Sequence, residues 1–292
     1  MSKHRGNIYI IPNLDKDIDL KVTSQIVQAL ARYGAAACFD HAIEDRVTAQ
    51  ALRGAVFLPE TEILSRADCV IVLGGDGTML RAAQGVAMCG LPMLGINLGN
   101  IGYMTQLEAN ELSLLEQVVN RQYEIDKRMM LEIKLEGQDG EIRRLTALND
   151  AVISKAGMSS GLAELELLCN GSRIISYRAD GVIIATPTGS TAYSFSAGGP
   201  IVDPSIEIVM ATPISPHSLF NRSIIFEGSS QLVIRVCDQS CEVALNADGQ
   251  LISRLTAGGY VTISKSEHKA NFISLKNNSF YKVLREKLKD SF

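Results

Sequence analysis

Apolar runs and helical patterns alternate along the first 120 residues of the chain. The runs "NIYII", "CVIVL" and "PMLGIN" have the nearly unbroken apolar character of buried strands. Between and after them, "SQIVQALARYG", "TMLRAAQGVAMCG" and "ELSLLEQVVN" place apolar residues at helical spacing. This alternation predicts an α/β N-terminal domain with a parallel sheet.

From about Tyr123 onward, the pattern changes to a succession of strands. Turn signals such as Asn170-Gly171 and Gly258-Gly259 separate these strands. Residues 123–269 are therefore predicted to form a mostly β C-terminal domain. The expected strands are "YEIDKRMMLEIKLE", "IRRLTALNDAVIS", "LAELELLCNG", "SRIISYRADGVIIAT", "SQLVIRVCD", "CEVALNADGQLI" and "YVTISKSE".

The last segment, "NSFYKVLREKLKD", returns to helical spacing. Phe280, Val283, Leu284 and Leu288 lie on one side of the predicted helix. We expect this C-terminal helix to return to the first domain, which would then comprise residues 1–122 and about 270–292.

Composition narrows the function classes. Hydrophobic residues make up 46% of the 292 positions and charged residues 21%, which is typical of a soluble globular protein. A net charge of −4 and a pI near 5.7 argue against binding to nucleic acid or to an anionic membrane. No apolar run approaches the ~18 residues of a membrane-spanning helix, and the first apolar stretch is too short for a signal peptide. We expect a cytoplasmic protein.

The cysteine pattern indicates thiols without a catalytic or metal-binding function. None of the six forms a CxxC pair, and no His stands near the last two to complete a zinc site. We expect reduced, mostly buried side chains and no protein metal site. These cysteines are Cys38, Cys69, Cys89, Cys169, Cys237 and Cys241.

The segment "GGDGT", residues 74–78, carries the first candidate chemistry. A tight turn is one interpretation, with glycines at positive φ and Thr78 capping the helix. However, the turn lies at the carboxyl end of a predicted strand, where open α/β sheets bind ligands. It contains neither a GKS/GKT nor a GxGxxG pattern. Backbone amides there could hold phosphate while Asp76 accepts the proton of an attacking hydroxyl, which favours phosphoryl transfer.

Residues 178–200, "RADGVIIATPTGSTAYSFSAGGP", form a second candidate site. Hydroxyl side chains interleaved with Gly and Ala offer hydrogen-bond donors and close backbone approach, and Tyr193 offers an aromatic face for a base. The alternative is a Ser/Thr-rich helix cap with a flexible loop.

Three further segments carry weaker signals. The polar pair in "LND", residues 148–150, is either a bulge or a set of hydrogen-bonding groups aimed at a ligand. Asp248-Gly249 is most simply a type I′ hairpin turn. Serines surround His217, but the sequence has no GxSxG elbow, so a hydrolase triad is not favoured.

Taken together, these segments resemble the NAD kinase family, whose members phosphorylate NAD to NADP. The matching motifs are "GGDGT" at 74–78, "ND" at 149–150, "DG" at 180–181 with "TPTGSTAYSFSAGGP" ending at 200, and "DGQ" at 248–250. The first motif is shared with lipid kinases and distantly with phosphofructokinases, whereas the long run is more specific. The resemblance covers nearly the whole chain and implies an α/β domain followed by a β domain.

The resemblance also implies the reaction. A phosphoryl group would pass from ATP, or from polyphosphate, to the 2′-hydroxyl of the adenosine ribose of NAD. Mg²⁺ or another divalent cation would accompany the donor, held mostly by phosphate oxygens. Family members are usually homo-oligomers, tetramers or dimers, in which one subunit can complete the neighbour's site.

Site residues follow by position. Asp76 matches the catalytic aspartate, Gly77 a contact with the dinucleotide, and Arg81 a basic position in the next helical turn. Asn149 and Asp150 match an Asn-Glu pair that holds ribose and adenine, although Asp150 reaches about 1.5 Å less far than Glu. The other implied nucleotide-binding residues are Arg178, Asp180, Thr188, Thr191, Ala192, Tyr193, Ser194, Phe195, Ser196, Ser215 and Gln250.

Two rival functions remain at this point. A lipid kinase would use the same turn but would need an apolar groove for acyl chains. A regulator that binds NAD or NADP without turnover would bind phosphate better without Asp76.

Overall fold

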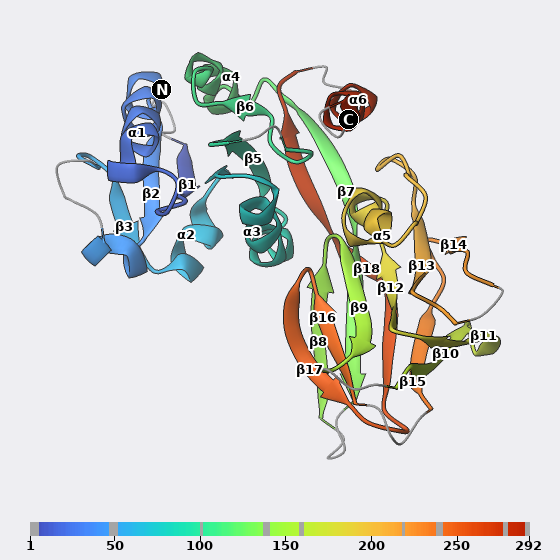
Figure 1. The fold of residues 1–292 in the computed structure, drawn as a ribbon. Coiled ribbons are helices and arrows are strands. Elements are labelled where there is room, and N and C mark those ends of the chain that lie inside the picture. The colour runs from blue at the N-terminus through green and yellow to red at the C-terminus, as the bar shows by residue number, and fades with distance from the viewer. Residues whose placement is uncertain are drawn as a thin grey trace. The chain divides into compact units, whose positions relative to one another are not determined.

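The computed structural model describes residues 6–46, 52–99, 102–136, 141–157, 161–217, 220–237, 242–276 and 280–289. The chain forms two compact units. Residues 1–127 and 270–292 make the first unit, and residues 128–269 make the second (Figure 1). The chain passes from one unit to the other within two strands, β7 (Glu124–Glu136) and β18 (Tyr260–Ser274).

The first unit contains the parallel sheet that the sequence predicts. Its strand order is β3-β2-β1-β4-β5, with β6 paired to β5, and each of these pairings is parallel. The strands are β1 (Asn7–Ile11), β2 (Ala36–Asp40), β3 (Val56–Leu58), β4 (Cys69–Leu73), β5 (Pro92–Asn97) and β6 (Leu107–Glu108). The α/β fold class predicted for this part of the chain is confirmed.

Helices connect these strands. Ile26 and Leu30 of α1 (Lys21–Tyr33) cluster with Leu115 of α4 (Leu115–Val119) and with Ile71 of the sheet, so both helices cover one face. Gly34, at φ 84°, ends α1. The remaining helical segments are η1 (Ile18–Leu20), η2 (His41–Arg46), α2 (Glu60–Arg66), α3 (Asp76–Met88) and η3 (Leu112–Leu114).

Helix α3 begins at Asp76, three residues before Met79, where it would begin if Thr78 were the cap. Gly75 is the N-cap residue and makes no side-chain cap. The hydroxyl of Thr78 instead accepts a hydrogen bond from Nδ2 of Asn13 at 3.1 Å. Prediction of a Thr78 cap is therefore wrong, and Asp76 stands in the first turn of the helix.

The second unit is mostly β, as predicted, and the strands of its first sheet pair antiparallel. One sheet has the order β14-β13-β12-β9-β16-β17. Its strands are β14 (Ile224–Glu227), β13 (Ile208–Ile214), β12 (Gly181–Ala185), β9 (Asp150–Lys155), β16 (Val243–Ala247) and β17 (Gln250–Leu255). The facing strands are β7, β8 (Ile142–Ala147), β10 (Ala163–Cys169), β11 (Ser172–Ala179), β15 (Leu232–Val236) and the first part of β18.

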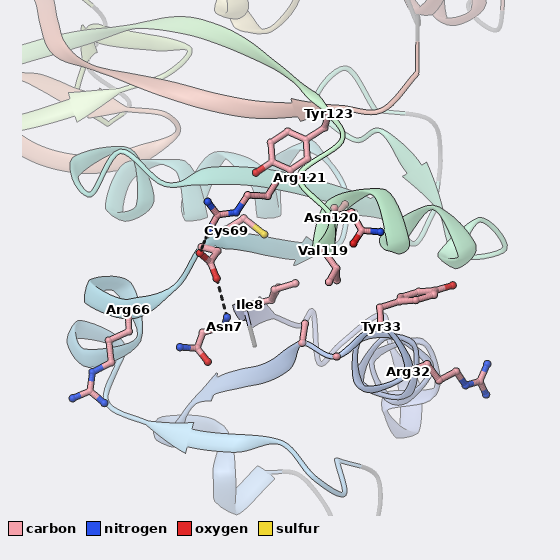
Figure 2. Close-up of a pocket in the computed structure, with 15 residues that line it drawn as sticks. Asn7, Ile8, Arg32, Tyr33, Arg66, Cys69, Val119, Asn120, Arg121 and Tyr123 are labelled. Carbon is pink, nitrogen blue, oxygen red and sulfur yellow. Dashed lines mark hydrogen bonds and ion pairs between the residues drawn. The ribbon is translucent and has the colours of Figure 1, made fainter. Parts of the chain in front are cut away.

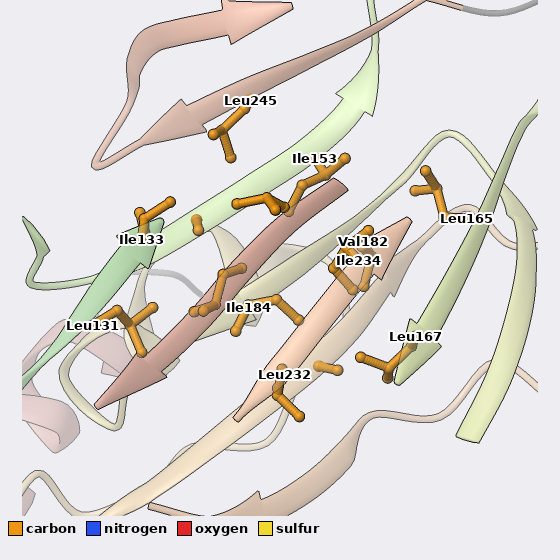
Figure 3. Packing of buried hydrophobic residues seen from close by; sticks show 14 of the residues in the cluster. Leu131, Ile133, Ile153, Leu165, Leu167, Val182, Ile184, Leu232, Ile234 and Leu245 are labelled. Atoms are coloured by element: carbon orange, nitrogen blue, oxygen red, sulfur yellow. The ribbon is translucent and has the colours of Figure 1, made fainter. Parts of the chain in front are cut away.

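Apolar side chains from both sets of strands fill the core of this unit. Figure 3 shows Ile153 and Val182 of one sheet near Leu165 and Ile234 of the other. Every residue of β12 is buried, because its other face packs in a smaller cluster that includes Ile183 and Met210. The helical segments η4 (Thr188–Thr191) and α5 (Tyr193–Ser196) follow β12 directly.

Two long predicted strands are each divided in the structure. "IRRLTALNDAVIS" forms β8 and β9, which belong to different sheets, with Leu148 and Asn149 between them. "SRIISYRADGVIIAT" likewise forms β11 and β12, with Asp180 between them. Extended residues on both sides hide such a switch, because the chain stays in the β conformation while it changes sheet. Interpretation of "LND" as a bulge is therefore wrong.

Strand β18 is longer than the predicted "YVTISKSE". Its first residues pair antiparallel with β15, and Asn271 and Phe272 pair parallel with β5 of the first unit. Helix α6 (Phe280–Lys289) follows, and the Phe280 ring lies 6.2 Å from the ring of Tyr103. The C-terminal helix therefore packs on the first domain, as predicted, whereas strands such as β2 and β13 were not predicted.

Candidate active site

The carboxyl ends of β1, β4 and β5 are neighbours at one edge of the parallel sheet. The glycine turn at residues 74 and 75 follows β4 at this edge. Gly74 adopts φ +146°, and its N–H donates to the carbonyl of Ile96 at 2.9 Å. A Cβ atom on Gly74 would lie 2.4 Å from Oγ1 of Thr78, so only glycine fits this turn.

Asp76 is held in place by the backbone of the following loop. The N–H of Met104 donates to Oδ1 at 2.9 Å, and the N–H of Tyr103 donates to Oδ2 at 3.0 Å. Lys287 of α6 brings Nζ to 3.7 Å from Oδ2 and to 4.6 Å from the centre of the Tyr103 ring. The carboxylate is still 30% exposed. Since a carboxylate accepts about four hydrogen bonds, it can take another donor in this fixed orientation.

Burial, together with the nearby charge of Asp76, raises the pKa of Tyr103 above its ordinary value. The phenol therefore stays neutral and serves as a packing surface for Phe280 and for Lys287.

Gly77 and Arg81 lie on the same helix as Asp76. A Cβ atom on Gly77 would meet no described atom within 4 Å, so its backbone is open to a ligand. Arg81 lines a pocket of about 380 Å³ together with Asn13, Arg46 and Glu60. Asp76 is not among the residues that line this pocket.

In the second unit, Asp248 fixes the backbone around Asn149. Its Oδ2 accepts from the N–H of Leu148 at 2.8 Å, and its Oδ1 accepts from those of Asn149 at 2.8 Å and Asp150 at 3.2 Å. Asp248 and Gly249 have φ of 49° and 78° and connect β16 to β17, so the predicted type I′ hairpin is confirmed. The sequence does not indicate this second role of Asp248, because Asp and Asn both suit such a turn and nothing local indicates a contact across about 100 residues.

Asn149 and Asp150 are buried next to one another, 9% and 5% exposed. Oδ1 of Asn149 accepts no hydrogen bond from any described residue, although it is buried. Burial, and secondarily the charge of Asp248, raises the pKa of Asp150 to about 7. The pair thus presents an unused acceptor and a carboxyl group that can carry a proton near neutral pH.

The hydroxyl-rich segment after β12 divides into two kinds of residue. Ser190 and Ser194 are fully buried, and their hydroxyls bond to Val202 N–H at 3.0 Å and to Thr212 Oγ1 at 3.0 Å. Tyr193 and Phe195 are exposed, as is Ser196, while Ala192 and Thr191 are partly exposed and Thr188 is buried. A Cβ atom on Gly189 would lie 2.1 Å from the carbonyl oxygen of Asn149, so this segment packs closely on the Asn149 loop.

The remaining predicted residues do not gather at one place. Gln250 starts β17 near Asp150, because Ala247 of the same hairpin pairs with Ala151. Arg178, Asp180 and Ser215 lie at the opposite end of β12, where Gly181 pairs with Ile214. Residues 180 and 186 flank β12 and are about 20 Å apart along an extended chain.

Charged side chains surround this second end of β12. Lys155 Nζ lies 2.7 Å from Oδ1 of Asp180, and the Arg178 guanidinium lies 3.2 Å from Glu164. The N–H of His217 donates to the carbonyl of Arg178 at 2.8 Å. The predicted site residues of the second unit therefore form two separate groups.

A pocket of about 950 Å³ lies at the opposite edge of the parallel sheet, where β1 and β4 begin (Figure 2). Arg32, Arg66 and Arg121 line it together with Tyr33 and Tyr123. Arg121 pairs with Asp68, which also accepts the N–H of Asn7 at 3.0 Å. None of the predicted site residues lines this pocket, although it is large.

Within the described ranges, no group of three or more His, Cys, Asp or Glu side chains could hold a metal ion. In the same part of the chain, no helix is both long and apolar enough to cross a membrane. Each of the five described cysteines is a free thiol. Only Cys38 and Cys69 are buried, so the expectation of mostly buried thiols is wrong, and Cys241 lies outside the described residues.

Comparisons with known proteins agree on one family. The model of the ATP-NAD kinase N-terminal domain matches residues 8–123, and that of the ATP-NAD kinase C-terminal domain matches residues 148–275. The chain is 39% identical over 280 residues to the NAD kinase of Caldanaerobacter subterraneus subsp. tengcongensis, covering 96% of this chain and 97% of that protein. The NAD kinase of Symbiobacterium thermophilum is 40% identical with the same coverage.

Solved structures give the same result. Yeast NADH kinase complexed with NADH matches with a TM-score of 0.88 and 26% identity, covering 99% of this chain and 89% of that one. An NAD kinase from Archaeoglobus fulgidus in complex with ATP matches with a TM-score of 0.75 and 25% identity, covering 97% and 98%.

Proposed function

Because the chain belongs to the NAD kinase family and is a kinase that phosphorylates NAD with ATP, we propose that Asp76 is the general base of this transfer. The acceptor is the 2′-hydroxyl of the adenosine ribose, and the product is NADP. Polyphosphate is an alternative donor, because it offers the same linear phosphate chain.

One observation carries this proposal. The Asp76 carboxylate is fixed by the N–H groups of Tyr103 and Met104 and remains 30% exposed at the carboxyl edge of the parallel sheet. Ligands of open α/β sheets bind at this edge. A general base needs both a fixed orientation and access to the proton it removes.

The transfer step balances with these groups. The ribose oxygen attacks the terminal phosphorus of ATP and forms the new P–O bond, while the bond to the bridging oxygen breaks and ADP leaves with the electron pair. The hydroxyl proton passes to a carboxylate oxygen of Asp76. Such a base contributes about 10²- to 10⁴-fold to the rate. Backbone N–H groups of the glycine turn, together with Gly77, stabilise the charge of the phosphoryl group.

Asn149 and Asp150 bind the adenosine part of NAD in this proposal. A buried acceptor without a donor costs about 1–3 kcal/mol, and the free Oδ1 of Asn149 is such an acceptor. An amino group of adenine or a ribose hydroxyl would supply the missing donor. Thr188, Thr191, Ala192, Tyr193, Phe195, Ser196 and Gln250 complete the nucleotide site, and Ser194 contributes its backbone, since its hydroxyl is bonded to Thr212.

A divalent cation, most simply Mg²⁺, accompanies the donor in this proposal. The described side chains include no cluster of three acidic, His or Cys ligands, so phosphate oxygens would provide most of its coordination. When bound, the ion neutralises charge on the transferring phosphoryl group. Arg81 is proposed to bind phosphate beside it.

Arg178, Asp180 and Ser215 are proposed to serve the site of a neighbouring subunit. These residues lie at one end of β12, and Thr188 follows its other end, about 20 Å away. This separation supports the assignment, because the predicted nucleotide-binding residues of one chain then belong to two separate places. A homo-oligomer follows, as a dimer or tetramer. We further propose that the two compact units correspond to the α/β domain and the β-rich domain. The free thiols are consistent with a place in the reducing cytoplasm, which we also propose.

The experiment compares the parent enzyme with Asp76→Asn. NADP formation from NAD, ATP and Mg²⁺ is followed with an NADP-specific dehydrogenase, and NADH is supplied as a second acceptor. We expect kcat to fall at least about a hundredfold in the variant, with little change in the KM for ATP. Asp76→Glu is the matched control that keeps the carboxylate.

Other outcomes separate the alternatives. Turnover in Asp76→Asn close to that of the parent would remove Asp76 from the role of base. NAD binding without product, measured by calorimetry, would favour the regulator. Activity on diacylglycerol in place of NAD would favour the lipid kinase.

A further inference from the structure

Lys16 lies beside the glycine turn although it is about 60 residues away in sequence. Its Nζ is 3.9 Å from where a Cβ on Gly75 would stand and 3.7 Å from where a Cβ on Gly99 would stand. Gly75 follows β4 and Gly99 follows β5, while Lys16 follows β1. Three neighbouring strand ends therefore bring an ammonium group to the backbone that precedes Asp76.

The loop that carries Lys16 is anchored on both sides. Oδ1 of Asn13 accepts the N–H of Lys16 at 3.1 Å, while Nδ2 of Asn13 donates to Thr78 of α3 at 3.1 Å. On the other side, the Asp17 carboxylate, which is 4% exposed, accepts the N–H groups of Val22 at 2.9 Å and Thr23 at 2.8 Å. The backbone of residue 16 is thus tied to α3 and to α1.

The ammonium group of Lys16 has no charged partner among the described residues. No ion pair or side-chain hydrogen bond joins Nζ of Lys16 to any described carboxylate, and residue 16 is exposed. The atoms beside it belong to glycine backbone, which leaves space for a ligand. Lysine binds phosphate as a point charge, and in P-loop proteins it does so from within the glycine loop, a position that "GGDGT" does not fill with a cation.

We propose that Lys16 binds the linear phosphate chain of the donor at the glycine turn and neutralises charge on the phosphates that leave. This inference rests on the proposed function, since it assumes that the donor lies beside Asp76. It assigns to the β1–α1 loop the positive charge that the turn itself lacks. The shared ligand chemistry is a chain of phosphoanhydride-linked phosphates, from ATP or from inorganic polyphosphate.

The test uses full-length Lys16→Met, which removes the charge and keeps the length of the side chain. Lys16→Arg keeps the charge, and Lys21→Met, an exposed lysine at the start of α1, is the matched control. KM and kcat are measured for ATP, for polyphosphate and for NAD. We expect the donor KM to rise about tenfold or more in Lys16→Met, as for the loss of one charge-assisted hydrogen bond, with the KM for NAD within about twofold.

Lys16→Arg should recover most of the donor affinity, and Lys21→Met should match the parent. If the KM rises for only one of the two donors, that donor supplies the phosphates that Lys16 binds. An unchanged donor KM with both donors, or a rise confined to the KM for NAD, would overturn the proposal.

A binding measurement separates this proposal from that for Asp76. Inorganic tripolyphosphate is titrated calorimetrically into the parent, Lys16→Met and Asp76→Asn. If tripolyphosphate binds more weakly to Lys16→Met but not to Asp76→Asn, the phosphate-binding role of Lys16 is supported, even if Asp76→Asn retains activity. Equal binding to the parent and to Lys16→Met contradicts it, whatever the role of Asp76.

Discussion

A Cβ atom on Gly102 would lie 2.4 Å from Oδ1 of Asp76. Gly102 is buried, and this contact leaves no space for a side chain, so only glycine fits here. The next two residues, Tyr103 and Met104, donate the N–H groups that hold the carboxylate. A residue without a side chain therefore lets the loop close on the proposed base.

Gly102→Ala is predicted to displace Asp76 and to reduce kcat. A shift of about 1 Å at a reacting group costs about a hundredfold, so we expect a loss approaching that size in a steady-state assay. Gly85→Ala on α3, the helix that carries Asp76, is the control, because a Cβ there meets no described atom within 4 Å. Full activity of Gly102→Ala would mean that the loop moves without disturbing the carboxylate.

The stability of the protein is predicted to depend on pH through Asp150. Its pKa in the folded chain is raised from 3.8 to about 7, chiefly by burial, so the folded state binds this proton more tightly than the unfolded state. The resulting stabilisation is complete below about pH 4 and is lost as the pH rises through about 7. Asp150→Asn should remove this pH-dependent stabilisation. The melting temperature of the variant minus that of the parent should therefore rise from about pH 5 to about pH 8, measured by scanning calorimetry in steps of about one pH unit. A constant difference over this range would contradict the buried titration.

Asp248→Ala is predicted to loosen the segment that carries Asn149. Removal of the carboxylate leaves the N–H groups of Leu148, Asn149 and Asp150 without their acceptor. We expect a loss of about 3 kcal/mol in the free energy of unfolding, measured with urea, and a higher KM for NAD. Asp248→Asn should lose less, because it keeps an acceptor oxygen and suits the type I′ turn. Equal losses in the two variants would show that charge, not hydrogen bonding, holds the segment.

Mixing two variants tests the shared site. Asp76→Asn and Asp180→Ala are each expected to be nearly inactive. If Asp180 serves a neighbouring subunit, co-refolded dimers should regain about a quarter of the parent activity, since half of the random dimers have one intact site. The control is the same mixture without refolding. If no activity is recovered, Asp76 and Asp180 of the same subunit contribute to the same site.

Local signals were sufficient to predict the parallel sheet, the β-rich region and Asp76. Apolar runs identify β1, β4 and β5, and an acidic residue among glycines after β4 is visible without any tertiary contact. The helical spacing of α3 is visible in its own residues, so the expected segment, which starts at Thr78, and the observed helix, which starts at Asp76, differ there by only two positions.

Contacts between distant segments could not be predicted in the same way. Asp248, Gly102 and Lys16 act through partners that the fold brings close, and none stands in an unusual local pattern. Likewise, Ser194 and Ser196 look equivalent in sequence, although one is buried against Thr212 and the other is exposed. The division of two long strands escaped prediction because the chain stays extended across each switch of sheet.

The path of β18 has a consequence for synthesis on the ribosome. Asn271 and Phe272 pair with β5, so the first unit lacks a strand until translation has passed residue 272, long after β5 itself has been made. Phe280 and Lys287, which contact Tyr103 and approach Asp76, leave the ribosome later still. A nascent chain ending before residue 280 would contain the glycine turn and the complete second unit, yet the surroundings of Asp76 would be unfinished. Maturation of the proposed base therefore waits for a segment that is translated after the second unit.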